Sequence, residues 1–142
     1  VKAKCLNDKL FIYEGKSFYG FPYINITGGE WNFEMAHENL ERQVSLIKRQ
    51  IIGHTKKTDE SFRLDVLISH SPPFNILDSY KDTNFGIHAL SNWIKEDMET
   101  FPKIMLCGHI HSAHGRKILT DPITKTQIEI INSATIATVI EI

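Results

Sequence analysis

The part of the sequence that most constrains the fold contains two short apolar runs with a helical pattern between them. The first run, Leu64–Ile68, stops shortly before Pro72 and Pro73, which together cannot continue a central strand. The second run, Ile104–Cys107, stops at a glycine. Between the runs, Pro102 ends a stripe with helical spacing that consists of Ile87, Leu90, Ile94 and Met98. We therefore predict a strand, a helix and a second strand, which is the arrangement of two parallel strands joined by a crossover.

Two patterns precede this unit. Phe11–Tyr13 and Ser17–Tyr19 flank a Glu-Gly pair, which predicts a tight hairpin. An amphipathic helix is then indicated by an apolar stripe of Leu40, Val44, Ile47 and Ile51. Gly53 stands where a C-cap glycine would end that helix, and the polar stretch Lys56–Arg63 is predicted to be a surface loop.

Two patterns follow the unit. Lys117–Thr120 and Gln127–Ile131 flank an Asp-Pro pair and predict a second hairpin. Ile136–Ile142 is predicted to be a last strand. The whole pattern is mixed α/β with a sheet rich in Ile and Val, and 142 residues fit a single domain over residues 1–142.

Histidine is abundant in this chain, with seven in 142 residues. His70 follows the first apolar run, while His109 and His111 follow the second. Ligands of open parallel sheets bind at the carboxyl ends of the strands, and neutral imidazole is a good ligand for transition metals. We therefore predict that these three histidines are metal ligands. His114 lies in the same loop, where we expect solvation or hydrogen bonding rather than ligation.

Charge and composition exclude several classes of protein. The chain has 16 basic and 17 acidic residues and a pI near 6.7, so neither a polybasic nucleic-acid arm nor an acidic tail dominates it. No apolar run approaches the ~18 residues of a membrane span, and no signal peptide is visible. Cys5 and Cys107 cannot form a disulfide framework, and we expect Cys107 to be a buried free thiol. These features suit a reducing compartment, and we expect a cytoplasmic protein.

Two segments carry a family resemblance. Asp65–Pro73 (DVLISHSPP) and Leu106–His111 (LCGHIH) resemble the last two signature motifs of the calcineurin-like metallophosphoesterases. The branch of small metallophosphoesterase-domain proteins is similar at three further stretches, Gly20–Tyr23, Ile76–Asp78 and Asn132–Ser133. The similarity covers nearly the whole chain, and its specific part is the pair of His-x-Pro-Pro and Gly-His-x-His motifs.

The resemblance implies an αββα sandwich, of which this chain would form the C-terminal half. It implies hydrolysis of a phosphate mono- or diester, such as a nucleotide, by two divalent ions of the Mn, Fe, Zn or Ni class. His70 and His109 would bind one ion and His111 the other, holding the ions rather than abstracting protons. Arg116 and His114 are candidates for binding the substrate phosphate, although Arg116 also fits a plain surface cation.

The family's earlier motifs, Asp-x-His, Gly-Asp and Asn-His, are absent from all 142 residues. They supply the remaining ligands, the bridging carboxylate and the catalytic histidine, so no catalytic residue is identified in this chain. Three histidines cannot hold two ions that each need five or six ligands. We therefore expect the chain alone to be inactive and to hold one ion or none.

Three explanations fit these missing motifs. The chain is the C-terminal part of a longer protein, which Val1 in place of Met favours; or an N-terminal half on another chain completes it; or it is a truncated, non-catalytic metal- or protein-binding domain. A structural zinc domain is disfavoured, because no cysteine pair accompanies the histidines. For the substrate, Phe21 and Tyr23 fit a base or aryl pocket and fit core aromatics equally well.

Overall fold

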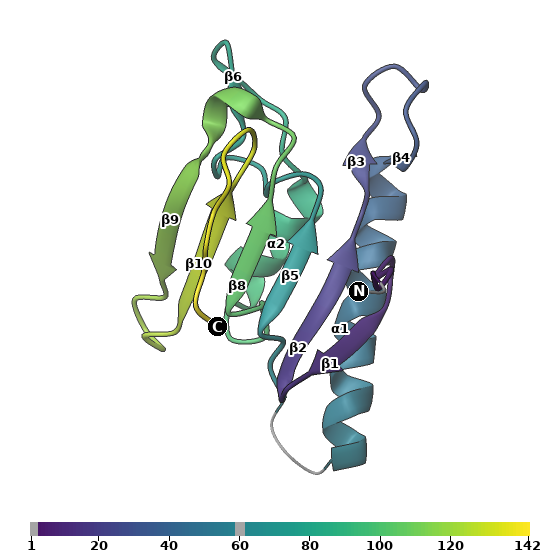
Figure 1. Cartoon of the computed structure of the whole chain (residues 1–142), viewed down its shortest axis with the longest axis vertical. Helices are drawn as coiled ribbons and strands as arrows, with labels where there is room; N and C mark the ends of the chain where they lie inside the picture. The colour runs from purple at the N-terminus through teal and green to yellow at the C-terminus, as the bar shows by residue number, and fades with distance from the viewer. Residues whose placement is uncertain (1–2, 59–61) are drawn as a thin grey trace.

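The computed structural model describes residues 3–58 and 62–142, and within them one six-stranded sheet carries two helices on one face (Figure 1). The strands of this sheet are β1 (Leu10–Tyr13), β2 (Lys16–Phe21), β5 (Val66–Ser69), β8 (Ile104–Cys107), β9 (Gly115–Thr120) and β10 (Gln127–Asn132). The helices are α1 (His37–Thr58) and α2 (His88–Glu96). The predicted α/β class, with a mixed sheet flanked by helices, is confirmed.

Shorter elements gather at one end of the sheet (Figure 1). They are the pair β3 (Ile24–Asn25) and β4 (Glu34–Met35), the pair β6 (Ser79–Tyr80) and β7 (Thr83–Asn84), and the 3-10 turn η1 (His111–Ala113). All of them lie in the loops that follow the carboxyl ends of the strands. Neither α1 nor α2, the helices of the described ranges, combines the length and apolar character needed to cross a bilayer.

The strand order is β1-β2-β5-β8-β10-β9. The central four strands are parallel, and each outer strand pairs antiparallel with its neighbour. The predicted strand, helix, strand unit is therefore confirmed as β5, α2 and β8, and both predicted hairpins are confirmed as β1-β2 and β9-β10. Because β2, β5, β8 and β10 run the same way, their carboxyl ends meet at one edge of the sheet.

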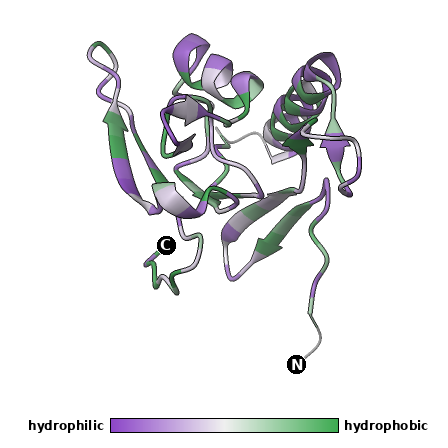
Figure 2. Ribbon diagram, turned by 90° about the horizontal axis from the view of Figure 1, so that it is seen from above, coloured by the Kyte–Doolittle hydropathy of each residue, from purple (hydrophilic) through white to green (hydrophobic). Residues whose placement is uncertain are grey.

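The hydrophobic core lies between the sheet and the helices. The apolar stripe of α1 is buried, and it belongs to the same hydrophobic core as strand residues that include Tyr19, Leu67, Met105 and Ile130. Side chains alternate along each strand, so Leu67 is fully buried while its neighbour Ile68 is 39% exposed on the other face. Figure 2 shows both helices on one side of the sheet and the C-terminal segment on the other.

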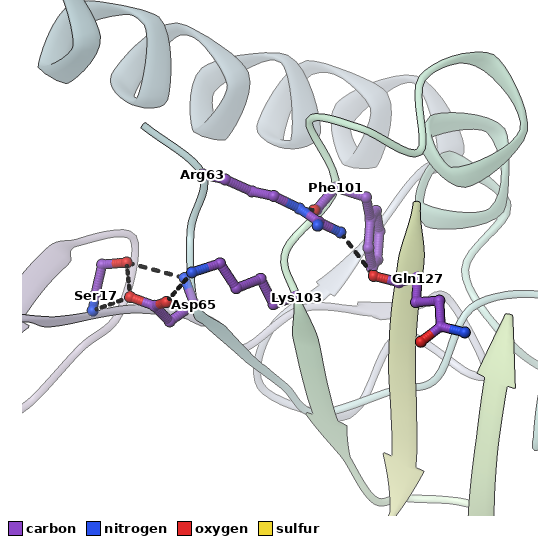
Figure 3. A network of polar contacts seen from close by, with 6 residues as sticks. All are labelled: Ser17, Arg63, Asp65, Phe101, Lys103 and Gln127. Atoms are coloured by element: carbon purple, nitrogen blue, oxygen red, sulfur yellow. Dashed lines mark hydrogen bonds and ion pairs between the residues drawn. The ribbon is translucent and has the colours of Figure 1, made fainter. Parts of the chain in front are cut away.

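Polar contacts fasten the opposite end of the sheet, away from the histidines (Figure 3). The Asp65 carboxylate accepts hydrogen bonds from the Ser17 backbone N–H and hydroxyl, each at 2.8 Å, and from Lys103 Nζ at 2.7 Å. Burial acts to raise the pKa of Asp65, but these bonds outweigh it and the pKa is lowered. Arg63 donates to the carbonyls of Phe101 and Gln127. The amino ends of β2, β5, β8 and β10 are thereby tied together.

Two predicted helix ends are wrong. Gly53 does not end α1, which continues to Thr58. One glycine inside a helix destabilises it by about 1 kcal/mol, and the packing of the apolar stripe outweighs this loss. The predicted loop at Lys56–Arg63 is helical as far as Thr58, and residues 59–61 lie outside the described residues. The second helix ends at Glu96, before Met98, because the Asp97 carboxylate bonds the N–H and hydroxyl of Thr100 in a local turn.

The predicted last strand is also wrong. Residues 133–142 form no strand, and Val139 is 94% exposed. Asn132 ends β10, and its side-chain Oδ1 accepts a hydrogen bond from the Ala134 N–H at 2.9 Å, which turns the chain away from the ladder. The apolar composition of Ile136–Ile142 satisfies strand propensity, but propensity alone does not provide a pairing partner.

Candidate metal centre

His70 and His109 meet at the carboxyl edge of the sheet because the two strands that precede them are parallel neighbours. His70 directly follows β5, and His109 follows β8 after a single glycine. A backbone hydrogen bond from the Gly108 N–H to the His70 carbonyl, at 3.0 Å, joins the two loops. A second one, from the His70 N–H to the Phe21 carbonyl at 3.1 Å, ties the His70 loop to the end of β2. The structure thus brings together two of the three predicted ligands.

The two rings face each other through nitrogen atoms. His70 Nε2 lies 3.1 Å from His109 Nδ1, with the ring centroids 4.8 Å apart. Partial burial lowers the pKa of both imidazoles, and the neighbouring rings of His70 and His111 lower the pKa of His109 further. Both rings are therefore neutral at neutral pH. Neutral imidazole is the form that binds metal.

His111 lies in η1 and lines the same cleft as the pair, although its side chain is exposed. Across residues 3–58 and 62–142, no three His, Cys, Asp or Glu side chains converge as a metal site. The described structure therefore contains a pair of facing imidazoles with a third nearby, and it brings no carboxylate to them.

The donor geometry of the pair fits one ion. Two nitrogens that bind the same ion at about 2.0–2.1 Å lie about 3 Å apart, which is close to the separation of His70 Nε2 and His109 Nδ1. The same separation is that of a hydrogen bond between two neutral rings. His70 and His109 could thus supply two ligands to one transition-metal ion, while a second ion would need ligands other than those gathered here.

The backbone at His109 is in the left-handed region, with φ of 67°. Few residues other than glycine adopt this conformation, and histidine is among those that do so more often. The conformation costs free energy and persists only where its surroundings impose it.

Asn132 is a site residue whose role the sequence did not reveal. Its side chain is buried at the end of β10, where Nδ2 donates to the carbonyls of Leu77 at 3.0 Å and Ile110 at 3.1 Å. One amide thereby connects the loop that carries His109 and His111 with the loop that follows β5. The sequence does contain one indication of this role, because Asn132 is a polar residue at the end of a buried, Ile-rich strand.

The loop after β5 has an internal anchor at Asp78. This buried carboxylate accepts hydrogen bonds from the N–H groups of Asn75 at 3.0 Å and Gly86 at 2.8 Å. Gly86 has to be glycine, because a Cβ there would meet the Pro73 carbonyl oxygen at 2.4 Å. Residues 72–87 are thus fixed against the end of β5, beside His70.

Neither of the two predicted phosphate-binding residues, His114 and Arg116, lines this cleft; both line a different hollow, beside Asn132. His114 Nδ1 lies 3.3 Å from the His111 carbonyl oxygen, as expected for a hydrogen-bonding residue. Arg116 lies on β9 and forms a two-point ion pair with Glu129 on β10. Phe21 is a core residue, and Tyr23 packs edge-on against it. The large aromatic residues that line the cleft of the imidazole pair are instead Trp31 and Phe33. Tyr80 and Phe85 line an adjoining cleft that shares Trp31, His109 and His111 with it.

No family model matches this chain. A UPF0046 protein of Caenorhabditis elegans is 26% identical over 110 residues, which cover 78% of this chain and 32% of that protein. An uncharacterized protein of Methanocaldococcus jannaschii is 27% identical over 120 residues, which cover 78% of this chain and 52% of that protein. The chain thus spans about a third and about half of the length of these curated relatives.

A solved crystal structure shares the fold, with a TM-score of 0.58 at 16% sequence identity. The match covers 91% of this chain and 45% of that one. At this level of identity the likeness concerns the fold alone. It places this arrangement of sheet and helices inside a chain about twice as long.

Proposed function

We propose that this chain provides the histidine side of a metal-dependent phosphoester hydrolase, whose substrate is a phosphate mono- or diester. The observation that carries the proposal is the facing pair of neutral imidazoles, His70 and His109, at the carboxyl edge of a parallel sheet. The resemblance of both loops to metallophosphoesterase motifs supports it. A divalent ion bound there would polarise the phosphoryl group and activate water.

In this proposal, His70 and His109 hold one ion through their facing nitrogens, and His111 extends toward a neighbouring ion. The lowered pKa of His70 and of His109 keeps both imidazoles neutral at neutral pH, and neutral imidazole is the form that binds a metal ion. Asn132 and Asp78 keep the two histidine loops in place. No proton-transfer role is assigned to any of these groups.

The remaining ligands would come from a second segment, on this polypeptide or on another one. Such a segment would cover part of the sheet face away from the helices, which exposes apolar side chains that include Ile68 at 39% and Ile118 at 61%. A covering layer would bury these side chains, as the resemblance to a sandwich implies. The residues that complete the metal centre would then reach the histidines from that layer.

The test is hydrolysis of bis(4-nitrophenyl) phosphate by the natural full-length protein with added Mn²⁺ or Ni²⁺. We expect metal-dependent turnover that falls at least about a hundredfold in His109→Ala. His54→Ala is the matched control, because His54 lies in the last turns of α1, at the other end of the sheet (Figure 1). Turnover that is absent with every metal, or unchanged in His109→Ala, would contradict the proposal.

A non-catalytic binding domain is the second candidate function. It is favoured by one observation, that the described residues bring no carboxylate to the imidazole pair. This candidate predicts that the natural full-length protein binds a single ion and shows no metal-dependent turnover. The same assay, combined with a measurement of bound metal, separates the two functions.

A further inference from the structure

A cleft of about 700 Å³ opens directly beside the histidine loop. His109 and His111 line part of it together with three large aromatic side chains, and the lining is completed by Thr27, Ile110 and Ser112. The aromatic residues are Trp31, Tyr80 and Phe85. Its volume is within the range of small-molecule sites. The cleft is therefore continuous with the candidate metal centre and large enough for a ring system.

The three aromatic residues come from three separate places in the fold and remain open to solvent. Trp31 precedes β4, Tyr80 ends β6, and Phe85 directly follows β7. They are 73%, 48% and 40% exposed. Single exposed apolar residues are common at protein surfaces, but several large ones around one hollow mark a binding surface.

Hydrogen bonds hold the backbone segments that carry Trp31 and Phe85 in place. The Glu34 carboxylate accepts hydrogen bonds from the Thr27 and Gly28 N–H groups, at 2.8 and 3.2 Å, and from the Thr27 hydroxyl, which fastens both ends of the loop that carries Trp31. On the other side, Asn25 Nδ2 donates to the Phe85 carbonyl at 3.1 Å. Preformed walls of this kind reduce the entropy lost when a ligand binds.

Charge further narrows the choice of ligand. No residue among those that line this cleft is acidic, and the two imidazoles are its only titratable nitrogen groups in the described part of the chain. An anion can therefore lie against His109 and His111 without repulsion. A flat, uncharged ring can stack on the exposed faces of Trp31 and Phe85, whereas an aliphatic chain would gain contact area without stacking.

We propose that this cleft binds a planar aromatic ring esterified to the substrate phosphate, either a nucleobase carried by its sugar or an aryl group. The inference rests on the proposed function only for the position of the phosphate. The ring site itself is carried by Trp31, Tyr80 and Phe85. It adds a specificity determinant for aromatic esters to the histidine centre.

The test is a ligand-observed NMR titration of the chain with phenyl phosphate, adenosine monophosphate and hexyl phosphate. Hexyl phosphate offers comparable apolar area without a π face. We expect phenyl phosphate, adenosine monophosphate or both to bind about tenfold more tightly than hexyl phosphate, the better of the two identifying the ring. Trp31→Ala should abolish this preference and Trp31→Phe should retain it. Tyr13→Ala, which removes an exposed aromatic residue on β1, should change nothing.

Two results would overturn the inference: equal affinities for the aromatic and hexyl esters, or a preference that survives in Trp31→Ala. Repeating the titration with Zn²⁺ separates this inference from the proposed function. If the aromatic preference holds while Zn²⁺ changes no affinity, the ring site stands and the metal centre fails. If Zn²⁺ tightens all three phosphates equally and no preference exists, the metal centre stands and the ring site fails.

Discussion

Replacing Asn132 by alanine tests whether this single amide holds the two histidine loops together. The change removes three hydrogen bonds of a buried side chain, to the Leu77 and Ile110 carbonyls and from the Ala134 N–H. The Ile110 carbonyl keeps a second partner, the Ala113 N–H at 3.1 Å. The other two groups lose the bond that Asn132 provides, at about 1–3 kcal/mol each.

Water can reach these loops, so the lower part of this range applies, about 1–1.5 kcal/mol for each of the two groups. We expect the free energy of unfolding to fall by about 2–3 kcal/mol, out of the about 5–15 kcal/mol typical of a whole domain. For a chain of this size, that is a decrease in Tm of about 8 °C. Urea denaturation followed by circular dichroism measures the change.

Asn132→Asp sharpens the test because the introduced carboxyl has the shape of the amide but, when ionised, no hydrogen to donate. Its negative charge would face the Leu77 and Ile110 carbonyl oxygens, so at neutral pH the loss should equal or exceed that of alanine. These contacts raise the pKa of the introduced carboxyl above its unfolded value. The unfolded state then binds fewer protons, so the penalty should shrink as the pH falls through the folded-state pKa.

Gln127→Ala is the matched control for this substitution. Gln127 begins the same strand, and its exposed amide makes a single 3.3 Å hydrogen bond to the Thr120 hydroxyl. Its loss should change the free energy of unfolding by less than about 0.5 kcal/mol. If Asn132→Ala is as stable as this control, Asn132 does not hold the loops and the account of how the histidines are positioned is wrong.

Three further predictions concern the scaffold. Gly53→Ala should raise the free energy of unfolding by about 0.5–1 kcal/mol, since Gly53 lies inside α1 and a Cβ there meets nothing within 4 Å; a loss of stability in denaturation would show otherwise. Iodoacetamide should label exposed Cys5 in the native protein and Cys107 only after unfolding, because burial raises the pKa of Cys107 to about 12; mass spectrometry would reveal native labelling of Cys107. Asp65→Ala should destabilise the protein at neutral pH, and the difference from wild type should narrow as the pH falls below about 4, through the lowered folded-state pKa; a difference that is constant across pH would argue against the role of the charge.

The sequence predicts most of the fold that positions the site. Apolar runs that end at prolines or at a glycine define β5 and β8, and the helical stripe between them forces a parallel crossover. That topology alone brings His70 and His109 to one edge. The apolar pattern was therefore enough to predict that the loops of His70 and His109 lie side by side, because neighbouring parallel strands end at the same edge of the sheet.

The predictions that were wrong or missing depend on tertiary contacts, which a short stretch of sequence does not contain. Gly53 is tolerated in α1 because packing of its apolar stripe outweighs propensity, and residues 136–142 have strand propensity without a partner strand. The role of Asn132 depends on the carbonyls of two distant loops, which no short window contains. The aromatic cleft was missed for the same reason, since Trp31, Tyr80 and Phe85 are brought together only by tertiary folding.

The central claim is that His70 and His109 jointly bind one transition-metal ion. Isothermal titration calorimetry with Ni²⁺ or Zn²⁺ on wild type, His70→Ala, His109→Ala and the double variant tests it most directly. We predict one ion per chain, a loss of at least about tenfold in each single variant, and a double variant little worse than either, because the two ligands act as a unit.

The pH dependence of the same titration adds a second criterion. Protons compete with the metal for the imidazoles, and both pKa values are lowered, so affinity should hold at neutral pH and weaken only below about 6.5. Binding that is unchanged in His70→Ala and His109→Ala, or losses that simply add in the double variant, would contradict the account.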